Sequence, residues 1–147
     1  MKILHINTLD TKGGASRVAY DLKNELKKRG HSSWIFVCKK FSKDNDVFYI
    51  AKDNFVEKIF RKITKRDLGL MLRNRITKFF PTDIDFFNDR GLFKSSQYKQ
   101  TDIIHCHNLH SNFFNLKNLI KISEEKPVIW TLHDMWAITA QCPHAFG

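Results

Sequence analysis

The chain alternates between short apolar runs and longer segments with helical spacing. The apolar runs have the length of buried strands and cover residues 2–7, 34–38, 47–50, 102–107 and 128–133. Apolar residues recur at three- and four-residue intervals from position 15 to 26 and again from 113 to 123, as on one face of a helix. Strand, helix, strand order indicates parallel strands joined by crossover helices. The expected fold class is therefore α/β, a parallel sheet with helices on both faces.

Polar residues follow three of the predicted strands. In an open parallel sheet, ligands bind beyond the carboxyl ends of the strands, which share one edge. These ends carry the Gly13–Gly14 turn after the first strand, His107, Asn108 and His110 after the fourth, and His133 and Asp134 after the fifth. Because segments far apart in the sequence converge there, we expect this edge to hold the functional site.

The glycine turn is a candidate anion-binding site. Gly13 and Gly14 let a ligand approach the backbone, and the helix that follows supplies free N–H groups and the positive end of its dipole. Arg17, one turn into that helix, adds a cationic side chain for a phosphate or a carboxylate. A plain strand-to-helix turn explains the same residues. No Gly-x-Gly-x-x-Gly pattern occurs, and no Walker lysine follows.

Two histidines raise the alternative of a metal site. His105 and His107 are two residues apart, which places both side chains on one face of a strand. Further ligands could come from Cys106, His110, Asp134, Cys142 and His144. The carboxylate-rich set of a hydrolytic metal site is missing, so we expect no metal and no other cofactor. Packed or hydrogen-bonded histidines are the alternative.

Charge and cysteine content limit the partners and the compartment. Lys plus Arg number 25 against 15 acidic residues, a net charge of +10, which favours an anionic partner such as a phosphate, a nucleotide, a nucleic acid or an acidic membrane. The three cysteines are odd in number and widely spaced, as expected of reduced thiols. No apolar run is long enough to span a membrane. We therefore expect a cytoplasmic protein.

Residues 52–80 differ from the rest of the chain. This segment contains nine basic and three acidic residues, an excess of six basic residues. Its apolar residues recur at helical spacing, which would place them on one side of a helix and the basic residues on the other. We expect one or two basic amphipathic helices inserted in the fold. Four cations, Arg61, Lys62, Lys65 and Arg66, would face an anionic membrane. A helix with its apolar side on the core and its charged side in water is the alternative.

Three segments together resemble the retaining glycosyltransferases of family four, which have the GT-B architecture of two Rossmann-like domains. They are Gly13-Gly-Ala-Ser-Arg-Val-Ala19, Asp102-Ile-Ile-His-Cys-His-Asn-Leu-His110 with Phe114-Asn-Leu116, and Lys126-Pro-Val-Ile-Trp-Thr-Leu-His-Asp-Met-Trp136. The last two are similar to a bacterial polysaccharide-synthesis branch of the family. The resemblance implies that residues 1–147 form the single Rossmann-like, acceptor-side N-terminal domain. The donor-binding C-terminal domain would lie outside this chain.

The resemblance also implies roles for individual residues. Gly13, Gly14 and Arg17 would bind the diphosphate of a nucleotide-sugar donor, and His133 would be catalytic. The acceptor side would be lined by His107, Asn108, His110 and Asp134. The acceptor would be a saccharide or a lipid-linked molecule, handled in the cytoplasm or at the inner face of the membrane, and no metal would be essential.

Two other classes of function remain open on the residues alone. The excess of positive charge together with thirteen Phe residues is compatible with a nucleic-acid-binding module, although no recognised binding motif is present. A metal-dependent hydrolase would use His105 and His107. Nucleic acid is not the expected partner.

Overall fold

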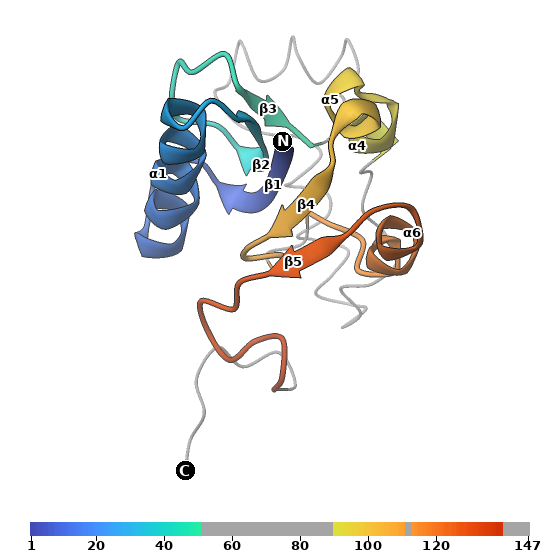
Figure 1. Ribbon diagram of the computed structural model, residues 1–147. Helices are drawn as coiled ribbons and strands as arrows, with labels where there is room; N and C mark the ends of the chain where they lie inside the picture. Colours follow the sequence, from blue (N-terminus) through green and yellow to red (C-terminus); the bar gives the residue numbers. More distant parts are fainter. Residues whose placement is uncertain (51–89, 111–112, 140–147) are drawn as a thin grey trace, which may run out of the picture.

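The computed structural model describes residues 1–50, 90–110 and 113–139. Within these ranges one parallel sheet has the strand order β3-β2-β1-β4-β5 (Figure 1). The strands are β1 (Lys2–Leu9), β2 (Ser32–Lys39), β3 (Val47–Tyr49), β4 (Ile103–Cys106) and β5 (Val128–Trp130). The helices are α1 (Gly14–Lys28), α4 (Arg90–Lys94), α5 (Ser96–Gln100) and α6 (Asn118–Glu125). The predicted Rossmann-like α/β fold is confirmed.

Helices cover both faces of the sheet. In Figure 1, α1 lies on one side and α4, α5 and α6 lie on the other. Tyr20 of α1 packs against a small cluster formed by Ile35, Val37 and Val47. The larger cluster lies on the opposite face, where every second residue of each strand points: Leu4, Ile6, Phe36, Ile104 and Cys106, with Leu92, Tyr98, Phe113, Phe114 and Ile122 from the helical side.

Helix α1 ends at a glycine turn. Gly30 has φ +83°, and its N–H donates to the carbonyl of Lys27 at 3.0 Å, while the N–H of His31 donates to Leu26 at 3.0 Å. These bonds use carbonyls that the helix leaves unpaired, and the glycine avoids the strain of a positive φ. The chain then turns directly into β2.

The helix predicted over residues 113–123 begins later than expected. Phe113 and Phe114 are both buried in the larger core cluster before the helix starts. The side chain of Asn115 accepts a hydrogen bond from the N–H of Lys117 at 3.0 Å, which makes a turn ahead of α6. The apolar positions were predicted correctly, but Phe113 and Phe114 lie in a loop before the helix, from which they pack into the core. The short helices α4 and α5 were not predicted from sequence.

The strand order places a switch point between β1 and β4. From β1 the chain passes to β2 on one side of the sheet, and it returns later to β4 on the other side, with Ile6 in register with Cys106. At such a point the connections leave in opposite directions, and a crevice opens beyond the carboxyl ends. The basic segment 52–80 lies outside the described residues. None of the described helices is long and apolar enough to cross a membrane.

Candidate functional site

Hydrogen bonds join the carboxyl ends of β1 and β4. The side-chain oxygen of Asn7 accepts from the N–H of Asn108 at 3.1 Å, and the Thr8 hydroxyl donates to the carbonyl of Asn108 at 2.9 Å. The Asn7 side chain also donates to the Ser16 hydroxyl at 3.2 Å, which connects this junction to α1. Asn7 is fully buried. These bonds hold the predicted segments at one edge, where the sequence analysis expected them.

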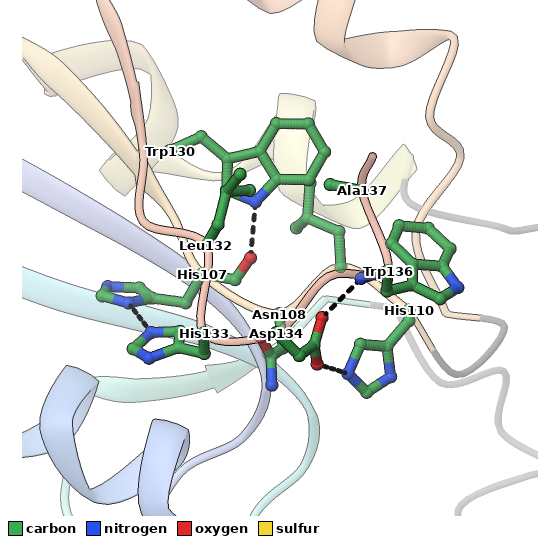
Figure 2. Close-up of a pocket in the computed structure, with 10 residues that line it drawn as sticks. His107, Asn108, His110, Trp130, Leu132, His133, Asp134, Trp136 and Ala137 are labelled. Carbon is green, nitrogen blue, oxygen red and sulfur yellow. Dashed lines mark hydrogen bonds and ion pairs between the residues drawn. The ribbon is translucent and has the colours of Figure 1, made fainter. Parts of the chain in front are cut away.

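A narrow cleft lies beyond β4 and β5 (Figure 2). Its walls are His107, Asn108, Leu109, His110, Trp130, Leu132, His133, Asp134, Trp136 and Ala137. The Trp130 indole donates to the carbonyl of His107 at 2.8 Å and thereby fixes the two strand ends side by side. The cleft encloses a volume of only about 10 Å³, room for about one water molecule. Pockets that bury a small ligand usually measure about 300–1,000 Å³, so this cleft needs a further wall to enclose one.

The predicted acceptor-side residues meet in this cleft. The carboxylate of Asp134 lies 3.2 Å from Nε2 of His110, and its other oxygen accepts the N–H of Trp136 at 3.0 Å. His107 and Asn108 border the same cleft from the end of β4. The two loops are thus joined by the contact between His110 and Asp134, whose side chains remain partly exposed.

Histidines form a hydrogen-bonded chain that leads from the cleft into the protein. Nε2 of His133 lies 3.0 Å from Nδ1 of His107, and Nε2 of His107 lies 3.2 Å from Nδ1 of His5. Nε2 of His5 then meets the Ser33 hydroxyl at 3.1 Å. His5 and His107 are almost fully buried. His133, at the cleft, is therefore the accessible end of a buried polar chain.

Burial keeps the inner histidines uncharged. Desolvation, and then the neighbouring His107, His105 and Lys23, hold the pKa of His5 well below its ordinary value. Desolvation, and then His105 and His133, lower the pKa of His107 to about 3. Each ring therefore carries one proton at neutral pH and can donate at one nitrogen while accepting at the other.

His105 lies beside this chain on the same face of the sheet. Its Nε2 is 2.8 Å from the Thr131 hydroxyl, and burial followed by the effect of His133 lowers its pKa. Ring nitrogens of His5, His105 and His107 lie within 4.8 Å of one another, the spacing of a possible metal cluster. His105 and His107 were predicted from the sequence, but His5 was not, although His5 and Asn7 alternate on β1 as His105 and His107 do at the end of β4.

The other ligands considered for a metal are distributed differently. Cys106 faces the opposite side of the sheet and is buried in the larger core cluster, so its inclusion among the possible ligands was wrong. Burial raises the pKa of its thiol to about 12, which keeps it protonated. His110 and Asp134 pair with each other in the cleft. Cys142 and His144 lie outside the described residues.

The glycine turn is open on the side of the ligand edge. Gly13 has φ +89° and precedes α1, and a Cβ atom added at Gly13 or Gly14 would meet nothing within 4 Å. No side chain caps this end of α1, and its first turn holds no acidic residue. The predicted cation Arg17 is exposed and bonds Asp21, one turn further along the helix, at 3.0 Å. The first N–H groups of a helix have no partner within the helix, and the space where a Cβ of either glycine would lie is empty.

Asp10, which was not predicted from the sequence, fixes the loop that leads to the glycines. Its carboxylate is buried and accepts the N–H groups of Thr11 at 2.9 Å, Phe41 at 2.9 Å and Ser42 at 2.7 Å. Burial opposes ionisation, but the bonds from Ser42, Phe41 and Thr11 outweigh it and lower the pKa of Asp10. Asp10 therefore holds the loops after β1 and β2 together as a charged anchor.

Comparisons with known proteins point to one group of enzymes. The family described as Glycosyltransferase Family 4 matches residues 12–146. WcaC of Escherichia coli K12, described as a glycosyl transferase of colanic acid biosynthesis, is 30% identical over 156 aligned positions. The alignment covers all of this chain and 36% of that relative, so the chain spans about a third of its length. No solved structure gives a significant match.

Proposed function

This chain belongs to glycosyltransferase family 4, and from that membership we propose that it transfers a sugar from a nucleotide-diphosphate donor. The acceptor is a saccharide or a lipid-linked molecule, and the product is part of a cell-surface polysaccharide. The configuration at the transferred carbon is retained. Residues 1–147 supply the acceptor-binding half of the site, and a second domain supplies most donor contacts.

One observation carries this proposal. The glycine turn, the His110–Asp134 pair and His133 all lie at the carboxyl edge of the sheet, around the switch point between β1 and β4. That edge is where α/β folds of this kind bind their ligands. The family match alone would support sugar transfer as the reaction. The convergence of these residues at one edge of the sheet supports a binding site on this domain.

The donor diphosphate binds at the start of α1. Gly13 and Gly14 leave room for close approach, and the uncapped N–H groups of the first turn face the phosphates. Arg17 reaches the same region when its exposed side chain releases Asp21, an exchange that costs little because exposed ion pairs are weak. Negative charge on the leaving phosphate is stabilised by these groups.

His133 acts at the sugar, and the acceptor lies along the narrow cleft. The chain through His107 and His5 orients the His133 ring from behind, so its other nitrogen is presented at the strand end. His107, Asn108, His110 and Asp134 line the acceptor side. The His110–Asp134 pair offers hydrogen bonds to sugar hydroxyls.

The 147-residue chain alone should transfer no sugar. Its cleft encloses only about 10 Å³, far too little for a nucleotide sugar, so the donor would lack a wall and would remain hydrated. Radiolabelled sugar transfer by this chain alone, with pooled nucleotide sugars and a lipid extract as acceptors, would contradict the division of the site into two halves.

The decisive test uses the enzyme with both domains. His133→Ala should lower kcat by at least about 100-fold, as expected for loss of a group that acts in the transition state, while the melting temperature changes little. His31→Ala is the matched control and should leave kcat unchanged, because His31 lies just before β2 and does not line the cleft. A large drop in melting temperature with normal kcat in the folded fraction would show that His133 is only a packing residue.

A further inference from the structure

Three imidazoles gather on the face of the sheet next to α1, behind the cleft. His5 of β1 and His105 of β4 are paired in register, and His107 follows two residues later on the same face. One ring nitrogen from each lies within 4.8 Å of the other two. His5 and His107 are buried, and His105 is half-buried. The proposed transfer reaction uses only the outer end of this cluster, at His133.

Each of the three rings is held from outside through one nitrogen. The partner is the Ser33 hydroxyl for His5, the Thr131 hydroxyl for His105 and Nε2 of His133 for His107. All three partners can accept a hydrogen bond. Histidines that bind a metal nearly always donate their second N–H to such a partner, which fixes the ring and raises its basicity. The outer contacts of a three-histidine metal site are therefore already present.

The separation of the inner nitrogens suits a small ion. A metal–nitrogen distance of about 2.0–2.1 Å in tetrahedral geometry places ligand nitrogens about 3.3–3.4 Å apart. Nδ1 of His5 and Nε2 of His107 are 3.2 Å apart. The rings of His105 and His107 have centroids 4.2 Å apart and are tilted by 30°, so His105 must turn to complete the set. His105 is half-buried, whereas His5 and His107 are buried.

We propose that His5, His105 and His107 bind a divalent transition-metal ion of the zinc type, with solvent as the fourth ligand on the side of His105. Imidazole is a preferred ligand of zinc, nickel and copper, and a neutral set of three favours such ions over magnesium or calcium.

The surrounding charge limits the affinity. Lys23 of α1 faces the same region and acts electrostatically on His5. It is paired with Asp44, which offsets part of its charge. Cys106 faces the other side of the sheet and supplies no thiolate. The site therefore binds its ion without an anionic protein ligand and exchanges it more readily than a cysteine-rich structural zinc site.

The ion would also determine what His133 can do. With Nε2 of His107 on the metal, Nδ1 of His107 must carry the proton and donate it to Nε2 of His133. His133 then carries its own proton on Nδ1 and acts as a donor, not as a base. This consequence for transfer rests on the proposed function, whereas ion binding does not.

Cobalt(II) titration of the purified chain tests the site without any sugar substrate. Cobalt replaces zinc and gives intense visible absorption in tetrahedral nitrogen sites. The parent should develop this absorption with one equivalent of cobalt and lose it when zinc is added. Its cobalt spectrum should lack the charge-transfer band of a thiolate ligand. His105→Gln should lose the absorption, because an amide replaces the ligating imidazole. Glutamine is chosen because it can still form a hydrogen bond with Thr131. Thr131→Val should weaken binding about 10- to 100-fold.

His31→Gln is the matched control for loss of one histidine, and circular dichroism checks that each variant is folded. Parent protein that shows no tetrahedral absorption with excess cobalt would overturn the proposal, leaving a purely hydrogen-bonded histidine chain. Equal binding by the parent and by His105→Gln would also overturn it, since the ion would then occupy another part of the chain. Neither result would affect the proposed transfer, which is measured separately through His133.

Discussion

At the scale of single residues, burial decides which polar groups can act and which only hold the structure. His5 and His107 are buried and uncharged, whereas His133 lies at the cleft with one nitrogen bonded to the chain behind it. Lys23 is the clearest buried charge: its side chain is 1% exposed, and Asp44 is its ion-pair partner. A buried cation without a partner is strongly destabilising, so the role of Asp44 is open to measurement.

Asp44→Asn should destabilise the chain by about 3–5 kcal/mol, because it leaves the Lys23 ammonium buried and uncompensated. Asp46→Asn is the control. Asp46 pairs with Lys27, whose side chain is 44% exposed, so this substitution should lower the free energy of unfolding by less than about 1 kcal/mol. Urea unfolding at pH 7 measures both. Similar losses in the two variants would mean that burial of Lys23 does not matter.

The Asp44 pair also predicts how stability changes with acid. Burial raises the pKa of Asp44, but bonds from Lys23, the Asp46 N–H and Tyr20 outweigh this and lower it from 3.8 to about 2. Because the folded-state pKa is the lower one, the contribution of Asp44 is full above about pH 4 and is lost as the pH falls towards 2. The difference in unfolding free energy between the parent and Asp44→Asn should therefore shrink over that range. A constant difference would contradict the assignment.

At the scale of elements, the start of α1 separates a conformational role from a ligand role. Gly13 has φ 89° and ψ 159°, a region that is accessible to glycine and strained for other residues. Gly14 is the first residue of α1, and its φ is not positive. Both have free space where a Cβ would lie. The two neighbours therefore differ in backbone strain and not in crowding.

Gly13→Ala should cost about 1–3 kcal/mol of stability, since alanine is strained at this φ and ψ. Gly14→Ala should be neutral or stabilising by up to about 1 kcal/mol, because alanine favours the helix. In the enzyme with both domains, Gly14→Ala should still raise the donor KM at least tenfold, because its methyl group occupies the space of the phosphates. An unchanged donor KM in this stable variant would show that the turn does not bind the donor phosphates.

At the scale of the whole molecule, charge is the property that the described site does not explain. The net charge of +10 is concentrated in part in residues 52–80, where nine basic residues exceed three acidic ones by six. A lipid-linked acceptor would require the enzyme to meet the membrane surface, and a basic amphipathic segment is attracted to anionic lipid. Each cation near such a surface contributes about 1 kcal/mol.

Replacing Arg61, Lys62, Lys65 and Arg66 by Glu should abolish co-sedimentation with vesicles of anionic lipid at low salt. The parent should pellet with these vesicles at low salt and be released at high salt, since surface attraction is screened. Vesicles of neutral lipid and a variant with Lys2, Lys27, Lys28 and Lys39 changed to Glu serve as controls for general charge. If the variant in 52–80 pellets like the parent, that segment is only solvated surface.

Local pattern was sufficient for the fold class and for the edge at which the polar strand ends meet. Periods of two and three to four residues reflect backbone geometry, so the parallel sheet, helix α1 and the polar strand ends could all be predicted. The family resemblance also came from sequence alone, through three short segments, and was confirmed. What these features share is that each depends on residues close together in the chain.

Tertiary structure decided which distant residues meet. The pairing of His5 with His105 depends on the register of β1 against β4, about 100 positions apart, and no local pattern encodes it. The same register directs Cys106 into the core and away from the histidines. Asp10 became an anchor only because the loop after β2 returns its N–H groups to it. Contacts of this kind arise from strand pairing and packing across the whole chain, so the sequence alone could list the candidates but could not group them.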